Sequence, residues 1–291
     1  MQLQGKTALV TGANSGLGKA VATALARAGA RVLMLCRDAG RGAAARDEVV
    51  AATGNERVEL LLCDLASQAA IRAGAAEVHR GIDALHLLVN NAGTAFAEHG
   101  LTADGVERSL AVNHLGPFLL TNLLLDLLRS GASAGDGARI VNVGTRIDTA
   151  MDFHDLNWER RPYRMMGAYG ESKLGNIHFT RELARRLEGT GVTVNCVFPG
   201  VFLSNLGGTD GAQNRALKLF AKLFGWALQK PQRAAQRVLY LLTADEVAAV
   251  SGEYFGDRKP IPAPLQADDP AANAELWRLS AALTGLDGGA G

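Results

Sequence analysis

Residues 6–18 read KTALVTGANSGLG, a short apolar run that ends in a turn with three glycines. The run lacks the polar alternation of a half-exposed strand, as expected for a strand covered on both faces. Gly12, Gly16 and Gly18 follow where the backbone has to close on a ligand before a helix begins. The free N–H groups and the dipole of a helix N-terminus favour a bound phosphate at such a turn. Because any tight turn needs glycine, the turn indicates a phosphate site mainly through its place between a strand and a helix.

The same alternation of apolar runs and helical stretches continues along most of the chain. The apolar runs lie at residues 6–11, 31–36, 57–64, 85–90, 138–143 and 192–198. Stretches of helical period stand between them, such as LGKAVATALARAG at 17–29 and SKLGNIHFTRELARRLEG at 172–189. Apolar strands separated by helices predict an α/β fold of the Rossmann type, with a doubly wound parallel sheet covered on both faces.

Length and composition favour a single domain over residues 1–291 that binds a small molecule. A chain of 291 residues with 48% hydrophobic and 20% charged content is long enough to bury a full core. Its formal net charge of +1 gives no field that would attract nucleic acid or an anionic membrane. The three cysteines lie in or beside apolar runs and the six histidines lack paired helical spacing, so we predict no metal site and a reducing compartment. No apolar stretch approaches the length of a membrane span, and we therefore expect a cytoplasmic protein without an integral membrane segment.

Three segments depart from the alternation. Residues 203–230 interrupt it, and insertions at the carboxyl edge of such a sheet usually shape a ligand site. Within this insertion, residues 216–230 place lysines on one helical face and leucines and phenylalanines on the other. That pattern fits a lid over a lipophilic substrate, a plain core helix or a helix lying on a membrane surface. Residues 131–137, GASAGDG, are expected to form a surface loop, and residues 284–291 a disordered tail.

Tyr169 and Lys173, in AYGESKLGN at 168–176, have the spacing i and i+4 within a helical run. This spacing puts the phenol and the ammonium on one helical face, where both can act on a common point. Tyrosine and lysine are also ordinary residues on a half-exposed helix. The pair therefore acquires chemical meaning only through the rest of the chain.

Five motifs together resemble the short-chain dehydrogenase/reductase family. They are TGANSGLG at 11–18, NNAG at 90–93, Asn113 in VNHLGPF, YGESK at 169–173 and PG at 199–200. They occur in the family's order over roughly the first 260 residues and on a predicted α/β alternation, which argues against coincidence. LNWERRPY at 156–163 and the segment 171–195 are similar to the retinol-dehydrogenase-like branch, whose members often carry a membrane anchor.

The resemblance implies catalytic roles for Tyr169, Lys173 and Asn113. In the family, the tyrosine is the general acid or base at the substrate oxygen, while the nicotinamide moves a hydride. The lysine holds the nicotinamide ribose, and the asparagine organises a water chain to the lysine; a residue that caps or kinks a helix is the alternative for Asn113. A free phenol has a pKa of about 10, and the charges of Lys173 and of a nicotinamide are expected to lower the pKa of Tyr169 toward neutral.

The chain departs from the family at residues 142–145, which read NVGT where the family usually reads NVSS. Thr145 thus occupies the place of the catalytic serine. Its hydroxyl can still donate to a substrate oxygen, but its methyl group restricts χ1 and takes space in the pocket.

The end of the second apolar run, in RVLMLCRDAGRG at 31–42, bears on cofactor choice. NAD-preferring members of the family place an acidic residue at the position of Cys36, where it binds the ribose hydroxyls. Here Arg37 follows instead, and a guanidinium can pair bidentately with a 2′-phosphate, which favours NADP(H). The alternative is that Arg37 is only solvated and that Asp38 binds the ribose. The resemblance places the cofactor against a larger set: Gly12, Asn14, Ser15, Gly16, Leu17, Gly18, Arg37, Asp64, Leu65, Asn91, Ala92, Gly93, Tyr169, Lys173, Pro199, Gly200 and Ser204.

The resemblance therefore implies an NADPH-dependent oxidoreductase that acts on a lipophilic ketone, aldehyde or secondary alcohol. Two alternatives stay open: a non-redox enzyme of the same fold, of the dehydratase or epimerase type, and a cofactor-binding regulator without turnover. The helix that holds Tyr169 is similar to one that pairs with its symmetry mate in many family members. We accordingly expect a homodimer or homotetramer.

Overall fold

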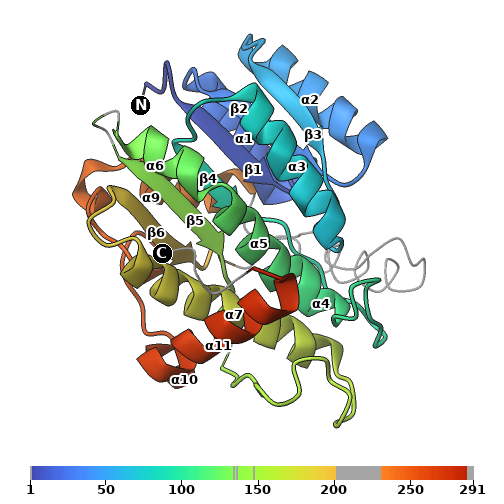
Figure 1. Cartoon of the computed structure of the whole chain (residues 1–291). Coiled ribbons are helices and arrows are strands. Elements are labelled where there is room, and N and C mark those ends of the chain that lie inside the picture. Colours follow the sequence, from blue (N-terminus) through green and yellow to red (C-terminus); the bar gives the residue numbers. More distant parts are fainter. Residues whose placement is uncertain (1, 134, 136, 147, 201–230, 287–291) are drawn as a thin grey trace, which may run out of the picture.

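A computed structural model of the chain describes residues 2–133, 135, 137–146, 148–200 and 231–286. Within these residues, seven parallel strands form one sheet in the order β3-β2-β1-β4-β5-β6-β7 (Figure 1). The strands are β1 Thr7–Thr11, β2 Arg31–Cys36, β3 Val58–Leu62, β4 Leu87–Asn90, β5 Ala138–Val143, β6 Val192–Val197 and β7 Tyr254–Phe255. The order reverses between β1 and β4, and ligands of open α/β sheets bind at the carboxyl ends of the strands beside such a reversal. The predicted Rossmann-type fold is confirmed.

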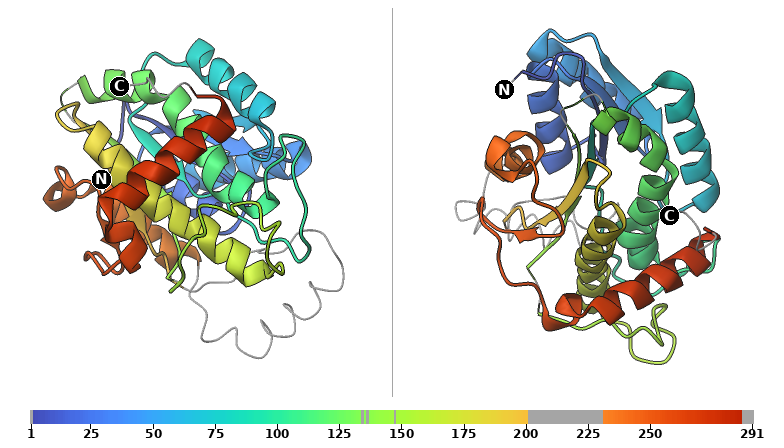
Figure 2. Two further views of the ribbon diagram at one scale, coloured as in Figure 1. Left: turned by 60° about the horizontal axis from the view of Figure 1, so that its bottom comes forward. Right: turned by 60° about the vertical axis from the view of Figure 1, so that its left-hand side comes forward.

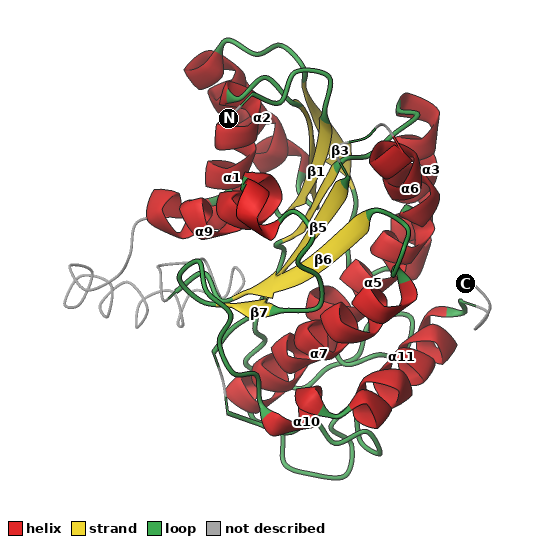
Figure 3. Cartoon of the chain, turned by 90° about the vertical axis from the view of Figure 1, so that its left-hand side faces the viewer, coloured by secondary structure: helices red, strands yellow, loops and turns green. Residues whose placement is uncertain are grey.

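Helices cover both faces of the sheet, as Figure 3 shows. Helices α1, α2 and α9 lie on one face, and α3, α5, α6 and α7 lie on the other. The long helices are α1 Gly16–Arg27, α2 Ala39–Thr53, α3 Gln68–Gly81, α5 Gly116–Leu123, α6 Leu125–Ser133, α7 Met165–Arg186, α9 Pro231–Thr243 and α11 Pro270–Thr284. The short ones are α4 Arg108–Leu110, the π-helical η1 Ala111–Leu115, the 3₁₀-helical η3 Asp245–Val247 and α10 Leu265–Asp268.

Neighbouring residues of each strand point to opposite faces of the sheet. Because helices cover both faces, the side chains on both faces have to be apolar. In β1, Leu9 joins the core under α3, α5 and α7, whereas Ala8 and Val10 join the core under α1 and α9. This double burial explains the unbroken apolar runs in the sequence. The cysteines at 36, 63 and 196 are buried free thiols, as the sequence predicts.

Two loop predictions are wrong in part. Residues 131–133 are not loop but the last turn of α6, where a Cβ on Gly131 would come within 2.1 Å of the Leu85 carbonyl oxygen. Glycine at this position allows α6 to pass close to the backbone at Leu85. From the sequence alone, this glycine was predicted to lie in a loop. The predicted start of the tail at residue 284 is also wrong. Thr284 is a buried residue of α11 and donates a hydrogen bond to the Ser280 carbonyl. The insertion at 203–230 lies outside the described residues.

Helix α11 lies across α7, as both views of Figure 2 show. Trp277 of α11 packs edge-on against Phe118, with ring centroids 4.9 Å apart, and lies 5.8 Å from the ring of Phe179 on α7. Most of α7 is therefore buried within one chain. Helix α11 thus covers this face of α7 within one chain, and the expected homodimer or homotetramer stays a prediction.

Within the described ranges, no single helix has the length and hydropathy to cross a membrane. One pair, Arg108–Leu123 with Leu125–Ser133, meets both criteria only when joined, and it is bent by 55°.

Candidate active site

The glycine-rich turn joins β1 to α1 at the carboxyl edge of the sheet. Gly12 and Gly16 have positive φ angles of 63° and 53°, which residues with side chains rarely adopt. Gly18 is required for a different reason, because a Cβ there would lie 2.4 Å from the Gly12 carbonyl oxygen. Ser15 stands at the N-cap of α1, and its hydroxyl makes no capping bond in the described part of the chain. The turn thus leaves polar groups and the helix N-terminus facing the space where a phosphate is expected.

A second loop, after β4, locks this turn in place. The Asn91 side chain donates through Nδ2 to the Thr11 carbonyl at 2.8 Å, and the backbone amides of Asn91 and Ala92 both donate to Thr11 Oγ1 at 3.0 Å. The predicted cofactor residue Asn91 therefore supports the glycine turn from behind. Thr11, which the sequence reading missed, is the acceptor that joins the two loops.

The end of β2 carries no free carboxylate. Burial raises the pKa of the Cys36 thiol to about 11, although the backbone amides of Ala13 and Asn14 donate to its sulfur. Asp38 is the N-cap of α2: its Oδ1 accepts from the Arg41 amide at 2.8 Å, and this bond lowers the pKa of its carboxyl. Arg37 is exposed. A ribose would have to compete with the helix cap for Asp38, whereas Arg37 is accessible to an anion.

The remaining predicted cofactor residues follow strands β3 and β6. Asp64 lies two residues beyond β3, and its Oδ1 accepts from the Ala66 amide at 3.0 Å, while Leu65 is buried. Pro199 and Gly200 follow β6 at the same edge of the sheet. Ser204 lies outside the described residues. Leu17 is buried in the core under α1, so its side chain supports the turn and cannot face a ligand.

Tyr169 and Thr145 come together although they stand on different elements. Tyr169 lies one turn into α7, and Thr145 follows β5, where the Tyr254 hydroxyl donates to its carbonyl at 2.9 Å. Burial raises the pKa of Tyr169, and the Thr145 hydroxyl, which can donate to the phenolate oxygen, lowers it. The lowering expected from Lys173 is not among the causes of this shift. In the protein without ligand, Tyr169 is therefore a phenol at neutral pH.

Lys173 lies one helical turn after Tyr169 on α7 and is buried. Its Nζ donates to the Val143 carbonyl at 3.0 Å, and only 3% of its surface is exposed. Loss of solvation lowers its pKa from 10.5 to about 8. A Cβ on Gly93 would come within 2.8 Å of Nζ, so the glycine of NNAG leaves room for the ammonium.

Asn113 lies in the π-helical turn η1, a distortion that is frequent at functional sites. Its Oδ1 accepts from the Thr94 amide at 2.8 Å, and its Nδ2 donates to the Thr94 carbonyl at 2.8 Å and to Ser172 Oγ at 2.9 Å. Ser172 in turn donates to the Tyr169 carbonyl at 2.7 Å. Asn113 thus ties the loop after β4 to the helix that carries Tyr169 and Lys173; the water chain to Lys173 stays a prediction.

The geometry therefore brings a buried phenol, a hydroxyl and an ammonium to one place beside a phosphate-type turn. Among the described residues, no group of three or more His, Cys, Asp or Glu side chains could hold a metal ion. Such a set can move a proton at a substrate oxygen without metal ligands.

Comparison with known proteins gives this arrangement a family. The family profile described as short chain dehydrogenase matches residues 6–215. The chain belongs to the short-chain dehydrogenase family. It lies in the retinol-dehydrogenase-like branch: it is 42% identical over 290 residues to retinol dehydrogenase 13 of Homo sapiens, covering 98% of this chain and 86% of that protein. Retinol dehydrogenase 14 of Mus musculus is 43% identical over 297 residues, with 98% and 87% covered.

Solved structures agree with this membership. An uncharacterised protein of Mycobacterium paratuberculosis has a TM-score of 0.76 and 31% identity, and the match covers 98% of this chain and 95% of that one. An NADP complex of Pseudomonas aeruginosa RhlG has a TM-score of 0.69 and 28% identity, with 88% and 95% covered. The family profile and the relatives named retinol dehydrogenase together make the chain an oxidoreductase of the short-chain dehydrogenase type.

The sequence reading of this short-chain dehydrogenase missed residues that act behind the motifs. Thr11, Thr94 and Ser172 hold the predicted residues in place through hydrogen bonds between distant segments. Thr11 and Ser172 lie within two of the quoted motifs and Thr94 directly follows NNAG, and these positions are the sign in the sequence that could have identified them.

Proposed function

We propose that the chain is an NADPH-dependent oxidoreductase of lipophilic ketones, aldehydes or alcohols. The observation that carries the proposal is the interaction between the Tyr169 and Thr145 hydroxyls, with the buried Lys173 one helical turn further along α7. The relatives named retinol dehydrogenase support a lipophilic substrate, because retinol is an apolar alcohol. The complex of the related Pseudomonas aeruginosa protein with NADP supports the cofactor.

The residues present fit a dinucleotide. At Gly12 and Gly18 a Cβ would press on the turn itself or on the loop after β4, so glycine keeps the turn tight where it leads into the N-terminus of α1. Arg37 would pair with a 2′-phosphate, since Asp38 is engaged as the cap of α2. The bound cofactor supplies or accepts the hydride.

The protein's own residues would donate the proton and stabilise the charges that develop during its transfer. Burial keeps the Tyr169 phenol protonated at neutral pH, so in the direction of reduction its hydroxyl can give a proton to the carbonyl oxygen. The Thr145 hydroxyl donates to the same oxygen as negative charge develops on it. The Thr145 hydroxyl, which lowers the pKa of Tyr169, can also donate to the tyrosinate that remains after the transfer.

The test is turnover of NADPH with a panel of lipophilic carbonyl compounds, including retinal, followed by the absorbance of the reduced nicotinamide. Tyr169→Phe keeps the ring and removes the hydroxyl, so turnover should fall by about 10²-fold or more while NADPH binding persists. Normal turnover by Tyr169→Phe would show that another group moves the proton. NADPH binding without turnover of any carbonyl compound would favour a cofactor-binding regulator. Conversion of a substrate without net oxidation of NADPH would favour an enzyme of the dehydratase or epimerase type.

A further inference from the structure

The catalytic helix begins without the usual side-chain cap. Arg164 occupies the N-cap of α7 and makes no side-chain capping bond, and Tyr169 is the fifth residue of the helix. The first turn of a helix has free N–H groups and opens most readily unless something holds it. Because Tyr169 has to stay against Thr145 on another element, contacts from outside α7 have to fix its first turn.

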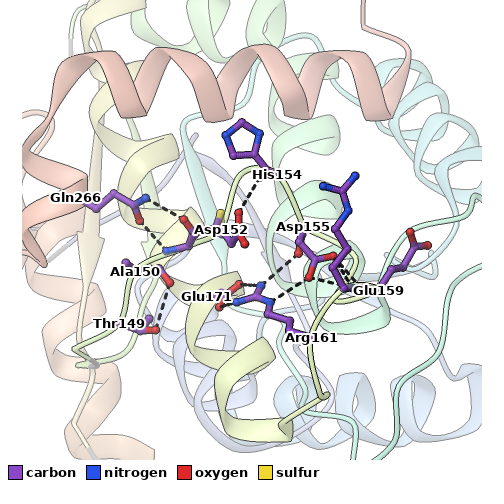
Figure 4. A network of polar contacts seen from close by, with 11 residues as sticks. Thr149, Ala150, Asp152, His154, Asp155, Glu159, Arg161, Glu171 and Gln266 are labelled. Carbon is purple, nitrogen blue, oxygen red and sulfur yellow. Dashed lines mark hydrogen bonds and ion pairs between the residues drawn. The ribbon is translucent and has the colours of Figure 1, made fainter.

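Arg161, in the loop before α7, provides such contacts (Figure 4). Its Nη1 and Nη2 donate to the two carboxylate oxygens of Glu171, each at 2.7 Å, and its Nε lies 3.3 Å from Asp155 Oδ2. Glu171 and Asp155 are only 6% and 5% exposed. The guanidinium thus binds the buried carboxylate of Glu171 on α7 with the fixed geometry of a fork and pairs by charge with the buried carboxylate of Asp155 in the loop.

Trp158 packs between Arg161 and the first turn of α7. The Arg161 guanidinium stacks on its ring at 3.7 Å, and the ring faces Gly167 in the first turn of α7. A Cβ on Gly167 would lie 2.5 Å from the ring. Trp158 has a φ of 56°, a conformation that is rare for a bulky residue and that persists only where the surroundings enforce it. We call Asp155, Trp158, Arg161 and Glu171 the clamp.

The other end of the same loop is also fixed. The Met151 amide donates to Gln266 Oε1 at 2.7 Å, and Gln266 Nε2 donates to the Met151 carbonyl at 2.9 Å. The loop runs from Thr145 to α7, so it covalently connects the two hydroxyls of the site. The loop is thus attached to α10 at Met151 and to α7 at Arg161.

Stability alone is a poor reason for such an arrangement. The two carboxylates are buried while the Arg161 side chain is 26% exposed, and removing buried charges from water costs free energy that an ion pair regains only in part. A pair that is costly to bury but geometrically exact fits a role in positioning.

We propose that Arg161 is a positioning residue, which through Glu171, Asp155 and Trp158 fixes the first turn of α7 and keeps the Tyr169 hydroxyl against Thr145. The kinetic part rests on the proposed reductase function; the structural part does not.

Two conservative variants test the clamp. Arg161→Lys keeps the charge but loses the fork, and Glu171→Gln keeps the shape but loses the charge. Arg185→Ala is the matched control: Arg185 makes two hydrogen bonds to the buried Glu182, of 2.7 and 3.0 Å, at the other end of the same helix. Hydrogen exchange of the amides at 165–172 and 180–187 is measured on the protein without ligand. The kcat, the KM of a carbonyl substrate and the Kd of NADPH are measured in parallel.

Both clamp variants should exchange faster at 165–172 but not at 180–187, and Arg185→Ala should not change 165–172. The kcat should fall by about tenfold to a hundredfold while the Kd of NADPH stays within about twofold, since misplacement of one catalytic group affects the chemical step. Unchanged exchange at 165–172, or faster exchange with a normal kcat, would overturn the positioning role and leave the reductase function intact. A wild type that turns over no carbonyl compound overturns the proposed function instead, and the exchange data then decide alone for or against the clamp.

Discussion

Replacing Lys173 by methionine should stabilise the protein while it abolishes the proposed activity. Burial lowers the pKa of Lys173 from 10.5 to about 8, which at about 1.4 kcal/mol per pKa unit makes the charged lysine unfavourable by roughly 3 kcal/mol. Methionine has a similar length and no charge. It loses the bond to the Val143 carbonyl, worth about 1 kcal/mol, but that carbonyl keeps a bond from Asn176 Nδ2 at 3.3 Å. We expect a net gain of roughly 2 kcal/mol in the free energy of unfolding at pH 7.

The pH dependence of the free energy of unfolding shows whether the buried charge of Lys173 causes the difference in stability. Between pH about 8 and 10.5 the unfolded chain binds the lysine proton and the folded protein does not, so this residue raises the stability of the wild type as the pH rises through that window. Below pH about 8 both states hold the proton and the full penalty is present. Urea unfolding of both proteins at pH 7 and pH 10 measures the difference, and subtraction removes the other groups that titrate in this range. The reasoning is refuted if Lys173→Met is less stable than the wild type at pH 7, or if its advantage does not shrink at pH 10.

Three further outcomes follow from the site. Arg37→Ala should remove most of an NADPH preference over NADH, because it removes the guanidinium proposed to bind the 2′-phosphate. Equal affinities of the wild type for NADPH and NADH, measured by titration, would contradict the proposal. Thr145→Val should lose most turnover, since a lost donor to the developing charge typically costs on the order of 3 kcal/mol, whereas Thr145→Ser should stay active. Gly18→Ala should weaken NADPH binding and lower the melting temperature, because its Cβ would meet the Gly12 carbonyl oxygen at 2.4 Å; unaltered binding would mean that the turn can shift.

The sequence predicted those parts of the fold that depend on local pattern. Strands β2 and β5 match the expected runs at both ends, because continuous apolar residues are needed wherever both faces of a sheet are covered. The motif residues at the ends of β1, β4, β5 and β6 reach one edge because parallel strands end there together. Strand β7 was missed, since Tyr254–Phe255 is too short to form a recognisable run.

Contacts between distant segments could not be predicted in the same way. The bond from Asn113 to Ser172 spans 59 positions, and nothing in either local pattern indicates it. Glu171 looks like a surface residue of a helix, yet it is buried against Arg161 from the preceding loop. The assignment of Gly131 to a loop failed for a similar reason, because the crossing with Leu85 that requires glycine is tertiary.

Helix α11 sets the order in which the chain can finish folding. Its bonds reach far back along the sequence: Arg72 Nη2 donates to the Thr284 carbonyl across 212 positions, and Gln68 Nε2 to the Leu283 carbonyl across 215. During synthesis, which proceeds from the N-terminus, the rings of Phe118 and Phe179 stay uncovered until Trp277 has emerged. Between the synthesis of Phe179 and that of Trp277, the nascent chain therefore lacks the ring that covers this aromatic surface beside α7.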